Sequence, residues 1–182
     1  MTLRLCFAPL ALAALLAGCA GTPMTSSPMS ASAPSAAATA TLQPTRGNST
    51  AGTVTFTQMG DHVMVSARVT GLKPNQEHGF HVHEKGDCSS GDGMSAGGHF
   101  NPTGKPHGPQ AGEHHTGDMP NLKADANGNA QASFHLMGVS IGSGATDIVG
   151  KGLIVHTNAD DYATQPTGNA GGRIACAVIQ KV

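Results

Sequence analysis

Residues 53–57 read TVTFT and residues 62–69 read HVMVSARV, and Met59-Gly60-Asp61 lies between them as a turn. In both segments polar and apolar side chains alternate with a period of two, which is typical of a β-strand with one buried face. In the second segment, the face that we expect to be buried consists of Val63, Val65, Ala67 and Val69.

Further strand signals follow towards the C-terminus. Asn127-Gly128 is typical of a type I′ turn and predicts a hairpin between residues 122–124 and 130–136. Residues 153–155 and 174–179 are short apolar segments of strand length, and no segment after residue 46 sustains the apolar period of a helix. The sequence therefore predicts an all-β fold, a β-sandwich or flattened barrel.

Two long segments separate these strands, Glu84–Asn121 and Asn158–Gly172. Loops of that length inside a compact domain are usually functional. We therefore expect the chemistry of the protein to lie in these two loops and the strands that flank them.

The composition narrows the function. The chain has 182 residues, which suits one domain of ordinary size. Its formal net charge of -1 excludes a nucleic-acid binder that works by neutralising phosphates. All 10 histidines lie between His62 and His156, so metal binding is the first hypothesis to consider.

The N-terminus carries export signals. Arg4 precedes the uncharged segment Leu5–Ala17, and Leu16-Ala17-Gly18-Cys19 resembles a bacterial lipobox. We expect residues 1–18 to be a signal peptide, residues 19–45 a flexible tether lipidated at Cys19, and residues 46–182 the folded domain. This predicts a periplasmic lipoprotein of the bacterial cell envelope, bound to the outer membrane through its N-terminal lipid. The alternative is an ordinary signal peptide whose cleavage site falls near a cysteine.

The cysteines fit an oxidising compartment. Cys6 leaves with the signal peptide and Cys19 takes the lipid, so Cys88 and Cys176 remain as an even pair. They form either a disulfide or two buried thiols.

The histidines fall into two groups by position. His81 and His83 alternate along one strand and therefore face the same side, and His156 ends a later strand. The first long loop adds His99, His107, His115 and Asp118. Three strand imidazoles and one loop imidazole form an all-nitrogen set that suits Cu(II), whereas three loop imidazoles and a carboxylate suit tetrahedral Zn(II). His99 can serve both metals, one through each ring nitrogen.

Four separated motifs resemble copper/zinc superoxide dismutase over about residues 50–182: Gly79–Glu84, Gly98–Pro102, His115-x-x-Asp118 and Gly168–Cys176. The resemblance implies that the all-β fold is an immunoglobulin-like Greek-key β-sandwich or flattened barrel. It also implies a Cys88–Cys176 disulfide, an anion-binding Arg173 beside the copper, and Asp160 as a carboxylate that links His81 to His107. By matching position, it implies copper ligands His81, His83, His99 and His156, and zinc ligands His99, His107, His115 and Asp118.

The implied activity converts two superoxide anions to oxygen and hydrogen peroxide by Cu(II)/Cu(I) cycling. Zinc would hold the bridging histidine, His99. The resemblance implies that His99 and Arg173 are the catalytic residues. The resemblance also allows a homodimer. The second long loop departs from eukaryotic members, because residues 162–172 carry no charged side chain that could steer superoxide.

Alternatives remain at this level. The same ligands would serve a non-enzymatic copper/zinc-binding protein of the envelope, or a copper-only dismutase. His114 could replace its neighbour His115, Asp160 could be a solvated loop acid, and Arg173 could be structural. We interpret His62, His78, His114 and His135 as surface or core residues, and the methionines as too scattered for a soft copper store.

Overall fold

The structure is a computed structural model that describes residues 35–182. The predicted signal peptide and Cys19 lie outside the described residues. Within them the chain forms β-strands and one short 3-10 turn, and it contains no α-helix. No helix in this part of the chain is long and apolar enough to span a membrane. The elements are β1 (Ala37–Pro44), β2 (Ala51–Met59), β3 (His62–Thr70), β4 (Glu77–His78), β5 (Phe80–His83), η1 (Met94–Ala96), β6 (Leu122–Lys123), β7 (Ala130–Met137), β8 (Gly152–His156), β9 (Arg173–Val178) and β10 (Gln180–Lys181).

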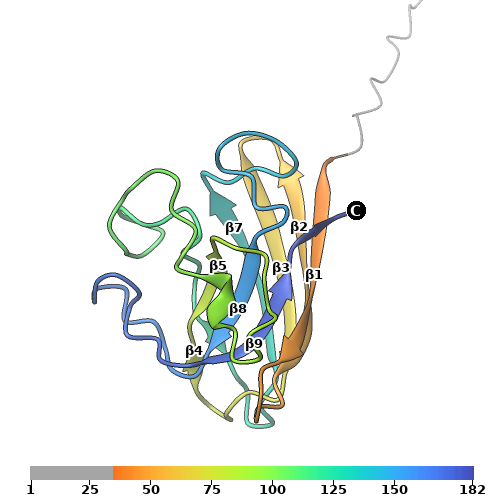
Figure 1. Cartoon of the computed structure of the whole chain (residues 1–182), viewed down its shortest axis with the longest axis vertical. Coiled ribbons are helices and arrows are strands. Elements are labelled where there is room, and N and C mark those ends of the chain that lie inside the picture. Colours follow the sequence, from red (N-terminus) through yellow and green to blue (C-terminus); the bar gives the residue numbers. More distant parts are fainter. Residues whose placement is uncertain (1–34) are drawn as a thin grey trace, which may run out of the picture. The chain divides into compact units, whose positions relative to one another are not determined.

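Eight of these strands form one curled antiparallel sheet in the order β5-β8-β9-β1-β2-β3-β7, with β10 paired to β1. Strand β1 connects the two halves, because it pairs along its length with β2 and at Gln43 and Pro44 with β9. Figure 1 shows β5, β8 and β9 lying across the layer made by β1, β2, β3 and β7. The predicted all-β Greek-key sandwich is confirmed.

The core lies between the two halves of the sheet. On β3, Val63, Val65, Ala67 and Val69 are buried as the alternation predicts. On β2, Val54 and Phe56 are buried beside them. Each fully buried Val or Phe side chain stabilises the fold by about 1.5–3 kcal/mol.

Strand β1 corrects the predicted boundary of the folded domain. Residues 37–44 are rich in Ala and Thr and belong to the predicted flexible tether, yet they pair with β2, β9 and β10. Ala38, Ala40 and Leu42 alternate into the core, where small side chains fit between closely packed strands. The tether prediction is therefore wrong for these residues.

The hairpin predicted at Asn127-Gly128 is also wrong in its partner and turn type. Strand β6 pairs with β4 instead of β7. Of the two turn residues only Gly128 has a positive φ, of 75°, whereas a type I′ turn requires positive φ at both. The Asp125 carboxylate accepts the backbone N–H groups of Asn127 and Asn129 and holds the alternative turn.

The two predicted long loops are present, at residues 84–121 and 157–172. In Figure 1 they extend on the side of the sheet that carries β5 and β8. The Cys88–Cys176 disulfide fastens the start of the first loop to β9, with 5.9 Å between the two Cα atoms. The predicted disulfide is therefore confirmed.

Candidate metal centre

The site begins at strand β5, whose side chains are buried on both faces. Phe80 and Val82 point into the core, and His81 and His83 point to the opposite face, which the first loop covers. The loop returns along the strand, where Phe100 donates its N–H to the Val82 carbonyl at 2.8 Å. This pairing brings loop residues against the strand histidines.

Four imidazoles gather at the first cluster, and their nearest ring nitrogens all lie within 4.8 Å of one another. The members are His81, His83, His99 and His156, all buried. His83 Nε2 and His156 Nε2 lie 3.4 Å apart. Because His83 Nδ1 donates to the Gly97 carbonyl and His156 Nδ1 to the Gly171 carbonyl, both Nε2 atoms present lone pairs to each other.

The remaining two rings of the first cluster also turn an unpaired nitrogen towards it. His81 Nδ1 and His99 Nε2 are buried and have no hydrogen-bond partner. Buried nitrogens without partners are costly unless a cation binds them. An all-imidazole set of this kind fits copper.

The second cluster consists of His99, His107, His115 and Asp118, whose nearest ligand atoms also lie within 4.8 Å of one another. His99 Nδ1 is 2.7 Å from Asp118 Oδ1, and His107 Nδ1 is 3.0 Å from Asp118 Oδ2. His115 Nδ1 lies 3.4 Å from His99 Nδ1, so two more ring nitrogens face each other. Three nitrogens and one carboxylate fit tetrahedral zinc.

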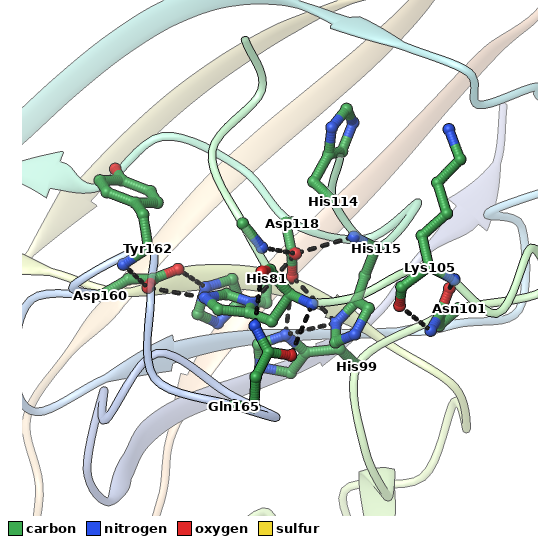
Figure 2. A network of polar contacts seen from close by, with 12 residues as sticks. His81, His99, Asn101, Lys105, His114, His115, Asp118, Asp160, Tyr162 and Gln165 are labelled. Carbon is green, nitrogen blue, oxygen red and sulfur yellow. Dashed lines mark hydrogen bonds and ion pairs between the residues drawn. The ribbon is translucent and has the colours of Figure 1, made fainter. Parts of the chain in front are cut away.

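His99 belongs to both clusters. Its Nδ1 faces Asp118 and His115, as Figure 2 shows, while its Nε2 is the unpaired atom of the first cluster. A single ring therefore separates the two candidate metal positions.

Asp160 connects the two clusters through hydrogen bonds to one histidine of each. Its carboxylate accepts His81 Nε2–H at 2.8 Å and His107 Nε2–H at 2.9 Å, and it is buried. These bonds orient both rings and leave the Nδ1 atom of each for a metal. Gly168, at φ +66°, passes so close that any Cβ there would overlap the Asp160 carboxylate.

Burial and charge set the proton affinities of the metal-free site. Burial lowers the pKa of His81 to about 4 and holds the pKa values of His83 and His156 well below their usual range. Burial also acts to lower the pKa of His107, but its hydrogen bonds to Asp118 and Asp160 outweigh this and raise it to about 9. Near neutral pH, the His81, His83 and His156 rings are therefore uncharged and can bind a cation.

Arg173 begins β9 and is tied to the first loop. Its guanidinium donates to the carbonyls of Gly93 and Gly97, both at 2.6 Å. The Gly97 carbonyl also accepts His83 Nδ1–H at 2.9 Å, so one oxygen holds both the ring and the guanidinium. The shared carbonyl places Arg173 beside the first cluster, where its positive charge helps to lower the pKa values of His83 and His156.

The other histidines lie outside the two clusters. His114 is only partly buried and donates to the Gly112 carbonyl, so His115 is the ring that the structure places in the second cluster. His78 is buried behind the first cluster, and its Nδ1 donates to the His156 carbonyl at 2.8 Å. His62 and His135 lie on the far side of the sheet, on β3 and β7.

Sequence reasoning missed Gln165, which fastens the second loop to the second cluster. Its side-chain amide accepts the His107 N–H at 2.9 Å and donates to the His107 carbonyl at 2.8 Å. It also missed Asn121, whose amide bonds both backbone groups of Asp160. No local pattern marks either residue, because each partner lies about 40 residues or more away along the chain.

Comparisons with known proteins agree with this geometry. The family model for copper/zinc superoxide dismutase matches residues 50–179. "Superoxide dismutase [Cu-Zn]" of Paramecium bursaria Chlorella virus 1 is 44% identical over 135 residues, which are 70% of this chain and 71% of that protein. "Superoxide dismutase [Cu-Zn] 2" of Aquifex aeolicus is 42% identical over 123 residues, 65% of this chain and 72% of that one.

Two solved structures are similar as well. A double mutant of a SOD-like protein from Bacillus subtilis superposes with a TM-score of 0.70 and 35% identity, covering 78% of this chain and 96% of that one. The clock protein EA4 superposes with a TM-score of 0.73 and 40% identity, covering 81% and 96% of the two chains.

Proposed function

The chain belongs to the copper/zinc superoxide dismutase family, and from this premise we propose that its two clusters divide the metals between them. Copper and zinc are the cofactors of this enzyme and superoxide is its substrate. The first cluster, with four imidazoles, is the copper site of the proposal. The second, with three imidazoles and the Asp118 carboxylate, is its zinc site.

Bound copper would supply a centre that passes one electron at a time, and bound zinc a fixed positive charge beside it. The overall reaction takes two superoxide anions and two protons to one oxygen and one hydrogen peroxide. The protein must therefore attract an anion and deliver protons.

His99 is the proposed proton carrier. Its Nδ1 is held among His115 and Asp118, whereas its Nε2 faces the first cluster without a hydrogen-bond partner. A ring fixed at one nitrogen can take up a proton at the other and donate it to reduced oxygen without moving away. The ring shared by both clusters is the single observation on which this proposal depends.

Arg173 is the proposed anion-binding residue. Two of its N–H groups are committed to Gly93 and Gly97, which fixes the plane of the guanidinium. A guanidinium has five N–H donors, so others remain for a charge-assisted bond to superoxide. A metal store would need neither this charge nor the shared ring.

The test compares metal content with activity. The full chain, loaded with copper and zinc, is expected to bind one of each, to show the Cu(II) spin-resonance spectrum of a nitrogen-ligated site and to dismutate superoxide. The variant H99Q is expected to lose most of the activity and to change that spectrum, whereas the variant H114Q, at a histidine outside both clusters, should retain both. Saturated metal sites without dismutation would instead identify a metal store.

We also propose that Cys19 is lipidated and anchors the enzyme to the envelope of a bacterial cell. The lipobox-like Leu16-Ala17-Gly18-Cys19 supports this. Metabolic labelling with a fatty acid should mark the wild-type protein and not the C19S variant. Equal labelling of both would disprove the anchor.

A further inference from the structure

A second group of metal-binding side chains lies on the outer face of strands β2, β3 and β7, away from both buried clusters. On β3, His62 and Met64 alternate with the buried Val63 and Val65 and therefore point outwards. On β7, His135 and Met137 are exposed on either side of the buried Leu136. Figure 1 shows the three strands side by side in the larger layer of the sheet.

The strand register brings these side chains together. His62 pairs with Met137, and Met64 pairs with His135. Met59, at the end of β2, pairs with His62 from the other side. Directly opposed residues on one face of an antiparallel pair have Cβ atoms about 4.5–5.5 Å apart. We call this set, Met59, His62, Met64, His135 and Met137, the Met–His face.

The two histidine rings of this face lie closer together than the register requires. The imidazole rings of His62 and His135 are diagonal neighbours, yet their centroids are only 4.6 Å apart. Met64 extends across to β7, where its Sδ accepts the Ser133 hydroxyl at 3.5 Å, on the side of His135 away from Met137. The Asp61 carboxylate accepts His62 Nδ1–H at 3.0 Å, which orients the ring and leaves its Nε2 free for a metal.

The composition of this face changes abruptly at one end. Nearer the middle of the strands, the outward positions are polar, with Thr55 on β2, Ser66 on β3 and Ser133 on β7. At the end, Met59 and Met137 are each 48% exposed and do not contribute to the core. Three thioethers and two imidazoles are therefore gathered where folding does not demand them.

Thioethers are soft ligands that select Cu(I), and imidazole binds copper in either oxidation state. We propose that the Met–His face binds one Cu(I) ion at the protein surface, separately from the two buried clusters. The proposal departs from our interpretation of the methionines as too scattered for a copper store, because the antiparallel register joins residues far apart in sequence. The site does not depend on the assignment of copper and zinc to the buried clusters.

The test uses the full chain with copper and zinc already bound and the copper reduced, so that the sample is diamagnetic. Its methionine methyl groups are labelled with ¹³C, and Cu(I) is added against a competing Cu(I) chelator. We expect one additional equivalent of Cu(I) to bind, with shifts confined to the methyl signals of Met59, Met64 and Met137. Met94, which is 60% exposed on η1, is expected not to shift.

The double variants H62Q/H135Q and M59L/M137L should each lose the additional equivalent, with the content of the buried metals unchanged. The control M94L should keep it. If no additional Cu(I) binds, or if only the signals of Met24 and Met29 shift, the proposal is wrong. Because buried metal content and dismutation are measured on the same samples, a failure of this site is distinguishable from a failure of the proposed enzyme centre.

Discussion

At the scale of single residues, the site depends on side chains whose second hydrogen-bonding atom is already occupied. His83, His156 and His81 each donate one ring proton to a fixed acceptor and so present the other nitrogen in a defined direction. Asp160 achieves this for two rings at once, one in each cluster. The orientation of the candidate ligands is thus set before any metal binds.

A first prediction concerns the charge of Arg173. Replacing it with Glu puts a negative charge beside the first cluster and removes the donors to Gly93 and Gly97. We expect dismutation to fall by about 10- to 1,000-fold, the range of electrostatic steering, and to depend less on ionic strength. Stopped-flow superoxide decay across a salt series measures both effects.

The control for this prediction is R68E, which makes the same charge change at an exposed position on β3. R173K should restore part of the activity, because it returns the charge without the bidentate donors. If R173E and R68E had equal kinetics, Arg173 would have no role in binding superoxide at the site.

At the scale of elements, the disulfide and the β5 pairing hold the first long loop in place. The Cys88–Cys176 bond ties the loop to β9, the strand that begins with Arg173. Cys176 packs with Ala96 and Ile154 in a small buried cluster of its own, against which Cys88 is packed. The loop is therefore anchored on both sides of η1, by the disulfide at Cys88 before it and by the pairing of Phe100 with Val82 after it.

A second prediction follows for the double variant C88S/C176S. The bond closes a loop of 88 residues, so its loss should lower the free energy of unfolding by about 4–5 kcal/mol in the chain-entropy description. Urea unfolding of the metal-free protein measures this. An unfolding midpoint equal to that of the wild-type protein would show that the packing of the loop alone is sufficient.

Sequence reasoning performed unevenly across the elements. It predicted β3 and the two long loops because alternation and loop length are local signals. It missed β1, since alternating Ala and Thr resemble a tether until a neighbouring strand is present to bury Ala38 and Ala40. It missed Gln165 and the Met–His face for a related reason: both arise from the register and loop packing of distant segments.

At the scale of the whole molecule, the buried histidines couple stability to pH. His81, His83 and His156 have pKa values lowered by burial, so the unfolded chain takes up protons before the folded one does. Their contribution to stability is complete above pH 6.5 and is lost as the pH falls below this value, in the case of His81 as it falls through about 4. His107, with its pKa raised to about 9, contributes below pH 6.5 and loses this contribution as the pH rises through 9.

A third prediction is that the metal-free protein is most stable near pH 6.5. On the acid side, each proton taken up only by the unfolded chain costs about 1.4 kcal/mol per pH unit. Urea unfolding after removal of metals by a chelator, at pH 5, 6.5 and 8.5, should give its highest midpoint at the central value. A midpoint that rises steadily towards pH 5 would contradict the burial of neutral rings in the first cluster.

The carbonyl of Gly97 couples two parts of the candidate copper site, the His83 ring and the Arg173 guanidinium, because it accepts a hydrogen bond from each. Gly97 has φ +74° and ψ -153°, a backbone conformation that is almost exclusive to glycine, and a Cβ there would overlap the Glu84 side chain. Any other residue must rotate this peptide group and so disturb the His83 ring and the Arg173 guanidinium together. A single substitution at Gly97 would therefore impair both the orientation of the His83 ligand and the binding of superoxide by Arg173. Neither property can change at this position without the other.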